Sequence, residues 1–257
     1  MECWHMSGAG NTFMVFDGRD LKLDLSETAK KLCALKNADG CMALDHSECG
    51  DFRLHFYNRD GSRGEMCGNG SRCVCRFAHD HGMTADSMVI QTDSGLVLGW
   101  RLRETEYRVA LNLPSVLELN RKPGCAYVEL GAPGVPHAVL PTETLDMEAL
   151  RPMAKALRQD AAFPKGANVN FYALDGKDYG RILTYERGVE DYTAACGTGA
   201  ASVAAVLWAQ GMLPEKRLRL TSQGGSLTVQ LEEKERTLTG LYLDGPTEAL
   251  EILDVTP

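Results

Sequence analysis

The sequence predicts an α+β fold of two pseudo-symmetric domains, each a curled β-sheet around a central helix. Three observations predict it. Short segments of alternating or β-rich sequence outnumber helical ones. A Cys-Gly-X-Gly segment runs into a helix once in each half of the chain, at Cys67 and at Cys196, which indicates duplication. The second of these helices, 198–210, is apolar nearly all round, as expected of a helix enclosed on every side.

Nine segments have the pattern of strands, because they alternate apolar with polar residues or are rich in β-formers. They are 52–57, 87–92, 107–113, 127–130, 168–174, 181–186, 218–222, 226–232 and 238–243.

Four helices are expected. Asp24 is predicted to cap a helix that runs to about Leu35, with Glu27 at the capping-box position. A short helix should begin near Leu150, because Pro152 is tolerable only in a first turn. The other two, 71–81 and 198–210, follow the Cys-Gly-X-Gly segments and end at Gly82 and Gly211.

The approach to the two cysteines is repeated as well. YNRDG begins ten residues before Cys67 and YERGV begins eleven before Cys196, and the cysteines are 196 − 67 = 129 residues apart. We therefore expect a first domain over 1–113, completed by the segment 246–257, and a second domain over 114–245.

Composition narrows the class of protein. The 257 residues are 44% hydrophobic and 24% charged, which is typical of a soluble globular chain. A formal net charge of −8, with no local block of Lys or Arg, argues against nucleic acid or an anionic membrane as a partner. The chain has no apolar run of 18 residues, and MECWHMSGAGN is not a signal peptide, so we expect a cytoplasmic protein.

In that compartment the nine cysteines are expected to be thiols. Cys3, Cys33, Cys41, Cys49 and Cys125 have no partner at motif spacing and are interpreted as packing residues. Cys67 and Cys196 differ, because a helix start favours an anion and makes a thiol there easier to ionise. With the neighbouring amides, the two would form a symmetric pair of thiols around a pocket for a carboxylate.

Other interpretations stay open at this point. Zinc is disfavoured, because Cys67, Cys73 and Cys75 are separated by five residues and by one, and His79 and His81 lie on different sides of a helix. A Cys196–His137 pair could transfer an acyl group, but this explains one thiol only. A module that merely binds a small carboxylate needs neither cysteine.

Two opposed thiols suit the inversion of a carbon that bears an acidic hydrogen. One thiolate removes the proton from one face, and one thiol delivers a proton to the other. No lysine context for pyridoxal phosphate and no phosphate-binding glycine loop is evident, so we expect no cofactor.

With both cysteines placed, the whole sequence resembles the diaminopimelate epimerase family of pyridoxal-phosphate-independent enzymes. MSGAGNTF (6–13) resembles the opening motif of the family, and MCGNGSRC carries its first catalytic cysteine. ANVNF (167–171), YERGVEDYTAACGTGA (185–200) and LDGP (243–246) resemble the later motifs.

The resemblance implies two domains, each a β-barrel around a helix, with the active site in the cleft between them. It implies that Cys67 and Cys196 are the acid and base, and that the reaction is the epimerisation of a small amino-acid substrate, L,L-2,6-diaminopimelate, to meso-diaminopimelate. It further implies that Asn11, Gly68, Asn69, Gly197 and Thr198 hold the reacting carboxylate. Arg187 would bind the remote carboxylate, Asn58 and Asn170 the distal amino-acid end, and Glu186 and His137 would be polar partners of the reacting centre.

Two positions depart from the family pattern. Where the family has Gly-Asn-Pro-His, this chain has Val135 in place of the asparagine. Gly40 stands where many members have glutamine. A racemase of another amino acid, such as histidine or glutamate, is therefore the alternative, and whether the chain forms a homodimer stays open.

Overall fold

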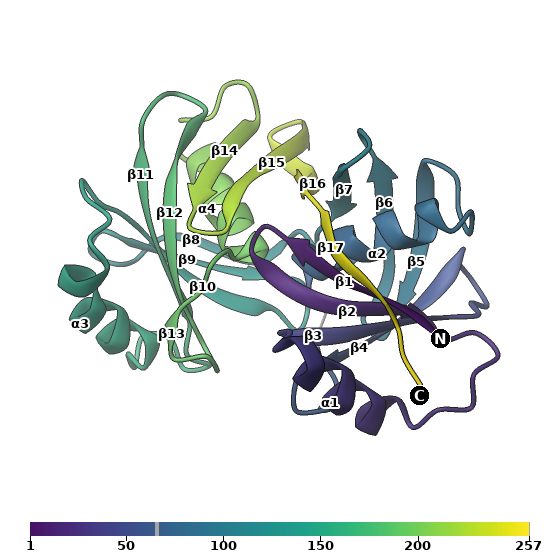
Figure 1. Cartoon of the computed structure of the whole chain (residues 1–257). Helices are drawn as coiled ribbons and strands as arrows, with labels where there is room; N and C mark the ends of the chain where they lie inside the picture. Colours follow the sequence, from purple (N-terminus) through teal and green to yellow (C-terminus); the bar gives the residue numbers. More distant parts are fainter. Residues whose placement is uncertain (65–66, 257) are drawn as a thin grey trace. The chain divides into compact units, whose positions relative to one another are not determined.

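A computed structural model describes residues 1–64 and 67–256, and the chain forms two compact units (Figure 1). Unit 1 comprises Met1–Ala110 and Asp244–Pro257, and unit 2 comprises Leu111–Leu243. The sequence placed the first boundary after residue 113 and the second after 245, so the two divisions differ by two or three residues.

Unit 1 begins with two strands and ends with the last strand of the chain. Its elements are β1 (Glu2–Gly8), β2 (Asn11–Asp17), α1 (Leu25–Lys36), β3 (Gly40–Asp45), β4 (Phe52–Asn58), α2 (Gly68–Asp80), β5 (Ser87–Thr92), β6 (Gly95–Arg101), β7 (Glu106–Ala110) and β17 (Glu248–Asp254).

Unit 2 is a continuous stretch of chain. Its elements are β8 (Pro114–Lys122), β9 (Cys125–Leu130), β10 (Val135–Pro141), α3 (Met147–Arg158), β11 (Asn168–Leu174), β12 (Tyr179–Glu186), β13 (Asp191–Tyr192), α4 (Gly197–Ala209), β14 (Arg217–Ser222) and β15 (Gly225–Lys234). The last strand, β16 (Thr237–Pro246), carries the chain back into unit 1.

Strand order and direction are repeated in the two units. In unit 1 the series β17, β1, β2, β3, β4, β5, β6 pairs antiparallel, antiparallel, parallel, antiparallel, parallel and antiparallel. In unit 2 the series β8, β9, β10, β11, β12, β14, β15 repeats the same directions. The helices α1 and α3 connect the first parallel pair of each series, and α2 and α4 connect the second. This repeat confirms the α+β fold of two similar halves.

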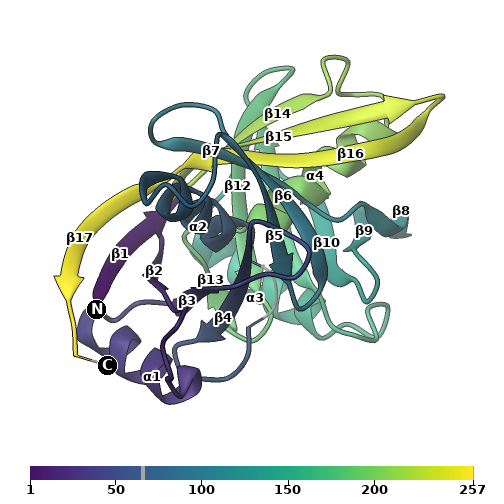
Figure 2. The ribbon, with the colours of Figure 1, turned by 90° about the vertical axis from the view of Figure 1, so that its right-hand side faces the viewer.

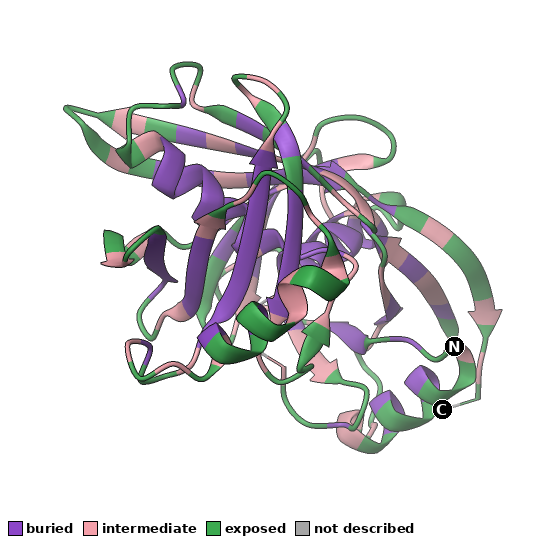
Figure 3. Cartoon of the chain, turned by 90° about the vertical axis from the view of Figure 1, so that its left-hand side faces the viewer, coloured by how far each residue is buried: buried purple, intermediate pink, exposed green. Residues whose placement is uncertain are grey.

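Each unit is built around one helix. α2 packs against β1, β2, β3, β6 and β7, and α4 packs against β8 to β11, β14 and β15. Nearly all of α4 is buried, since its small and apolar side chains leave no polar face. α1 and α3 lie outside, and Figure 3 shows α3 exposed on its outer side, over buried strands.

Helix α1 confirms the predicted cap. The Asp24 carboxylate accepts hydrogen bonds from the backbone N–H groups of Ser26 and Glu27, and the Glu27 carboxylate binds Lys30. The prediction for α3 was wrong in its start. The helix begins at Met147, where Asp146 caps it, so Pro152 lies in its second turn and not its first.

All nine expected segments contain strands, although the one expected over 107–113 ends at Ala110, and the described residues contain eight further strands that were not expected. β2 and β3 are buried apolar runs without strict alternation, and β10 contains Pro136 and ends at Pro141. β17 is largely exposed and is a strand because it pairs with β1.

The two ends of the chain lie close together beside β1 and β17 (Figure 2). The amino group of Met1 donates to the carbonyl oxygen of Val255 at 2.6 Å.

The cysteines interpreted as packing residues are buried with one exception. Cys3, Cys33 and Cys41 belong to the core between α1 and the strands of unit 1, and Cys125 to that of unit 2. Burial raises the pKa of the Cys3 thiol to about 12 and that of Cys33 to about 11, so both stay neutral. Cys49 is exposed, because it lies in the turn between β3 and β4.

Candidate active site

Both candidate cysteines are the N-cap residues of the central helices. Cys67 precedes α2 with φ −115° and ψ 112°, and Cys196 precedes α4 with φ −128° and ψ 107°. The two backbones have the same conformation, so each unit presents a thiol beside the first amides of its helix. Such amides have no intrahelical partner and suit an anion.

In unit 1, side chains tie the first turn of α2 to the β1–β2 turn. Asn69 is 2% exposed, and its Nδ2 donates to Oδ1 of Asn11 at 2.7 Å. The amide of Asn11 also reaches Asp39, with Nδ2 3.5 Å from Oδ2, and Asp39 accepts from the backbone N–H of Thr12 at 2.9 Å. The structure thus brings Asn11, Gly68 and Asn69 together with Cys67.

In unit 2, the first turn of α4 holds the second thiol. The Sγ atom of Cys196, a residue 8% exposed, accepts from the backbone N–H of Gly199 at 3.3 Å and lies 3.5 Å from Oγ1 of Thr198. Gly197 is the first helical residue and is buried. The three predicted members of this group are therefore adjacent.

Next to this turn, three buried polar side chains connect neighbouring strands. Asn170 on β11 donates through Nδ2 to Nδ1 of His137 on β10 at 3.1 Å, and also to the carbonyl oxygens of Ala138 and Asn168. Its Oδ1 accepts from Oγ1 of Thr184 on β12 at 3.0 Å. Both ends of the Asn170 amide are thus used inside the protein.

His137 is fully buried and neutral. Burial, and then the nearby charge of Arg187, lower its pKa to about 3. Because the Asn170 amide N–H donates to Nδ1, the ring proton lies on Nε2. Among the residues described, this Nε2 has no hydrogen-bond partner. His137 therefore offers one buried N–H donor.

Glycine is required where α4 meets this group. A Cβ atom at Gly199 would overlap Oδ1 of Asn170 and lie 3.2 Å from Oγ1 of Thr184. The helix start that carries Cys196 is therefore in direct contact with Asn170 and Thr184, the side chains that lie beside His137.

Glu186 is the last residue of β12 and Arg187 follows it, and both are partly exposed. The backbone N–H of Arg187 donates to Oδ1 of Asn168 at 2.8 Å, and its Nη1 donates to the carbonyl oxygen of Lys165 at 2.9 Å. The influence of Arg187 on the pKa of His137 places its charge near that ring.

Asn58 forms its side-chain hydrogen bonds within its own turn and not with the other predicted site residues. It is exposed, and its Nδ2 donates to Oγ of Ser62 at 3.0 Å within the turn after β4. Gly40 lies opposite Asn58 in the β3–β4 register. A Cβ at Gly40 would be 2.5 Å from Cε2 of Phe56, so the Phe56 ring occupies the space that a longer side chain would need.

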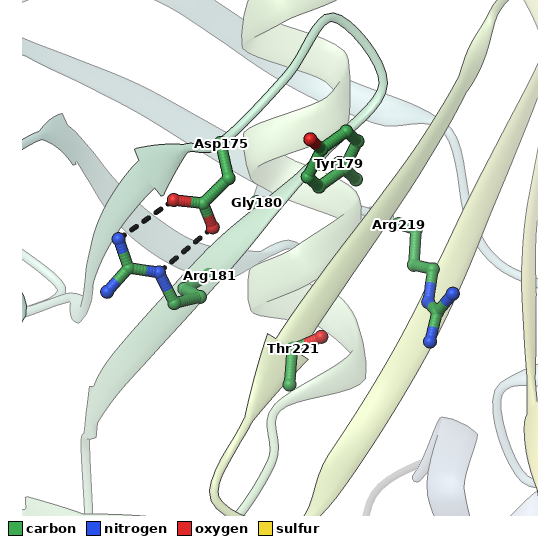
Figure 4. Close-up of a pocket in the computed structure, with 6 residues that line it drawn as sticks. All are labelled: Asp175, Tyr179, Gly180, Arg181, Arg219 and Thr221. Atoms are coloured by element: carbon green, nitrogen blue, oxygen red, sulfur yellow. Dashed lines mark hydrogen bonds and ion pairs between the residues drawn. The ribbon is translucent and has the colours of Figure 1, made fainter.

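Two hollows accompany these features. In unit 1, one is lined by Leu54, Phe56, Gly64, Cys67 and residues 92–94. In unit 2, a hollow of about 380 Å³ is lined by Asp175, Tyr179, Gly180, Arg181, Arg219 and Thr221 (Figure 4). Asp175 and Arg181 bind each other on one side of it, and none of the predicted site residues lines it. Of these two hollows, the one in unit 1 is the one that a candidate cysteine, Cys67, lines.

Over residues 1–64 and 67–256, no group of three or more His, Cys, Asp or Glu side chains has an arrangement that could hold a metal ion. No helix in the same ranges is long and apolar enough to cross a membrane.

Comparison with known proteins identifies the relatives of the chain. The profile of the family described as diaminopimelate epimerase matches residues 3–112 and 132–249. The chain belongs to the diaminopimelate epimerase family. A family member from Aquifex aeolicus, named diaminopimelate epimerase, is 36% identical, and the match covers 93% of this chain and 94% of that one. Another, from Chlorobaculum tepidum, is 34% identical over 95% and 97% of the two chains. The chain is accordingly an isomerase.

Solved structures show the same fold at low sequence identity. A PhzF-family phenazine biosynthesis protein from Bacillus anthracis matches with a TM-score of 0.78 at 14% identity, over 100% of this chain and 99% of that one. A hydroxyproline epimerase from Agrobacterium vitis matches with a TM-score of 0.69 at 18% identity, over 99% and 90%.

Three residues in these contacts were missed from the sequence. Asn168 and Thr184 lie in strands, where their polar side chains resemble ordinary outward-facing positions. Arg72 lies inside the GNGSRC motif and donates to the carbonyl oxygen of Gly68 and to Oδ1 of Asn69. The sequence could have drawn attention to Arg72, because it is the only charged residue in the short stretch GNGSRC.

Proposed function

We propose that the chain epimerises L,L-2,6-diaminopimelate to meso-diaminopimelate without a cofactor, for lysine and peptidoglycan precursor synthesis. One observation carries this proposal: Cys67 and Cys196 cap the central helices of two repeated units with the same backbone geometry. The names of the relatives supply the substrate.

The proposed reaction exchanges one proton at the α-carbon. A thiolate of one cysteine removes the α-hydrogen as a proton, and the thiol of the other donates a proton to the opposite face. The electron pair that remains is delocalised into the substrate carboxylate. Backbone N–H groups at the starts of α2 and α4, at Gly68, Asn69, Gly197 and Thr198, would stabilise that charge, assisted by Asn11. In the reverse direction the two thiols exchange roles.

Recognition of the far end of the substrate is assigned to side chains of both units. Arg187 suits the remote carboxylate, because guanidinium binds carboxylate with two parallel hydrogen bonds. Asn58 and Glu186 suit the distal amino-acid group. The contacts of Asn170 favour a supporting role, since its amide is occupied by His137 and Thr184. His137 would then supply its Nε2–H near the Cys196 helix start.

Racemisation of another amino acid is the second candidate. Val135 and Gly40 favour it, because the family pattern has an amide side chain at each position. Phe56 fills the space beside Gly40 with an apolar ring. An amino acid whose side chain is shorter or less polar than that of diaminopimelate would need fewer amide donors at these two positions.

The test is incubation with L,L-diaminopimelate in D₂O under reductant. Mass spectrometry follows α-deuterium, and chiral chromatography follows the isomer, with L-histidine and L-glutamate in parallel. We expect deuterium and meso product from diaminopimelate alone. Exchange only with another amino acid would keep the thiol chemistry and replace the substrate.

The role of the thiols is tested by substitution. Cys67→Ala and Cys196→Ala should each lower turnover at least about 10²-fold, the usual contribution of a general acid or base. Cys49→Ala is the matched control, because Cys49 is exposed and lies in the β3–β4 turn. Full turnover by either folded active-site variant would exclude the two-thiol mechanism.

A further inference from the structure

Arg72 is a fully buried cation beside the first turn of α2. Its side chain is 0% exposed. Nη1 donates to the carbonyl oxygen of Gly68 at 3.2 Å, and Nη2 donates to Oδ1 of Asn69 at 3.0 Å. Among the residues described, Nε has no hydrogen-bond partner. Both contacts are therefore with the residues that directly follow Cys67.

No described carboxylate forms an ion pair with Arg72, although burial without a counter-charge is costly. Burial lowers the pKa of its guanidinium, but arginine stays charged at neutral pH. The groups whose negative charge would stabilise it are, in order, Cys73, Cys67, Cys75 and Asp244. These four groups are therefore the candidates for a compensating negative charge.

Three of the four are poor candidates. Burial raises the pKa of Cys73 to about 12 and that of Cys75 further, so both remain thiols. Asp244 already binds Arg108 on β7 through two hydrogen bonds of 2.6 and 2.8 Å. Cys67 is only partly buried and caps the helix, where the macrodipole also favours an anion.

On the other side of Cys67, one carboxylate is bound by two guanidinium groups. Asp93 lines the same hollow, but its carboxylate binds Arg53 at 3.0 Å and Arg63 at 3.6 Å. Leu54 and Phe56 complete that wall with apolar surface. Arg72 is thus the buried cation in the described surroundings of Cys67 that lacks a carboxylate partner.

The two repeated helices differ in the residue five positions after the cysteine. Counting five residues on from Cys67 gives Arg72, and counting five on from Cys196 gives Ala201, which is also 0% exposed. His137, the titratable group near the start of α4, is neutral. A buried positive charge therefore lies beside the first thiol, whereas the Sγ atom of the second accepts the backbone N–H of Gly199.

We propose that Arg72 is a positioning residue that stabilises Cys67 as a thiolate, so that Cys67 is the anionic member of the cysteine pair before substrate binds. Cys67 is then the base for the isomer whose α-hydrogen faces it, and Cys196 is the acid. This assignment of base and acid rests on the proposed function, whereas the charge state of Cys67 does not.

The test measures the charge of each thiol without substrate. Iodoacetamide alkylates thiolates, and peptide mass spectrometry separates Cys67, Cys196 and the exposed reference Cys49. Each rate, measured from pH 6 to pH 10, is divided by its own value at high pH, which removes differences in access. In the wild type we expect the Cys67 curve to lie at lower pH than the Cys196 curve.

Substitution of Arg72 should abolish that difference. Arg72→Met keeps the length of the side chain and removes the charge, and should lower the normalised Cys67 rate at pH 7 about tenfold, because a nearby opposite charge shifts such an ionisation by one unit or more. The Cys49 and Cys196 curves should not move. Arg72→Lys retains a charge and should restore most of the rate.

The proposal is overturned if Cys67 and Cys196 of the wild type give the same curve, or if Arg72→Met leaves the Cys67 curve in place. The wild-type comparison and Arg72→Lys keep the test valid should Arg72→Met fail to fold. A protein that shows the Arg72-dependent shift but does not epimerise diaminopimelate would refute the proposed function alone.

Discussion

His137 should make the stability of the protein depend on pH. Its pKa is about 3 in the folded protein, against 6.5 for an unfolded chain. Below pH 6.5 the unfolded state binds a proton that the folded state does not, so this contribution to stability is complete above pH 6.5 and is lost progressively as pH falls to about 3. Between pH 7 and pH 5 the loss is about 2 kcal/mol, at about 1.4 kcal/mol per unit.

The assay is urea unfolding at pH 7 and pH 5 for the wild type and His137→Gln. The variant should lose about 2 kcal/mol less than the wild type between the two values. Val139→Ala, two residues beyond His137 on β10 and 1% exposed, is the control, because it opens a cavity and keeps the imidazole. Equal losses in wild type and His137→Gln would refute the assignment of a neutral buried ring.

Two smaller changes test the local structure. Gly199→Ala places a methyl group against Oδ1 of Asn170 and should destabilise unit 2 by about 1–3 kcal/mol, seen as a lower urea midpoint; an unchanged midpoint would contradict that close approach. Asp24→Ala removes the acceptor for the N–H groups of Ser26 and Glu27 and should cost about 1 kcal/mol in thermal unfolding; an unchanged melting temperature would contradict that cap.

Local patterns were sufficient for part of the fold. The helices after Cys67 and Cys196 were predicted because glycines precede an uninterrupted helical pattern, and the repeat of that arrangement indicated two similar units. The start of α3 was misplaced, because Pro152 was given more weight than the capping residue Asp146. β17 could not be predicted, since it exists through pairing with β1 some 250 residues away in sequence.

For the candidate site as well, the sequence predicts local features but not contacts between distant segments. Cys67 and Cys196 are identifiable from the sequence because helix starts and their amides are local features. The contact of His137 with Asn170 depends on the parallel register of β10 and β11, which the sequence does not specify. Arg72 was missed because an arginine in an amphipathic helix normally faces water, and only the surrounding strands of unit 1 bury it.

The pairing of β17 with β1 also bears on how the chain folds during synthesis. Unit 2 is continuous and has all its strands once β16 has left the ribosome, whereas unit 1 lacks an edge strand until the last residues emerge. The second half of the protein should therefore mature before the first. Since Met1 and Val255 touch, a short linker could join the ends, and a circular permutant opened in an exposed turn of unit 1 would reverse that order.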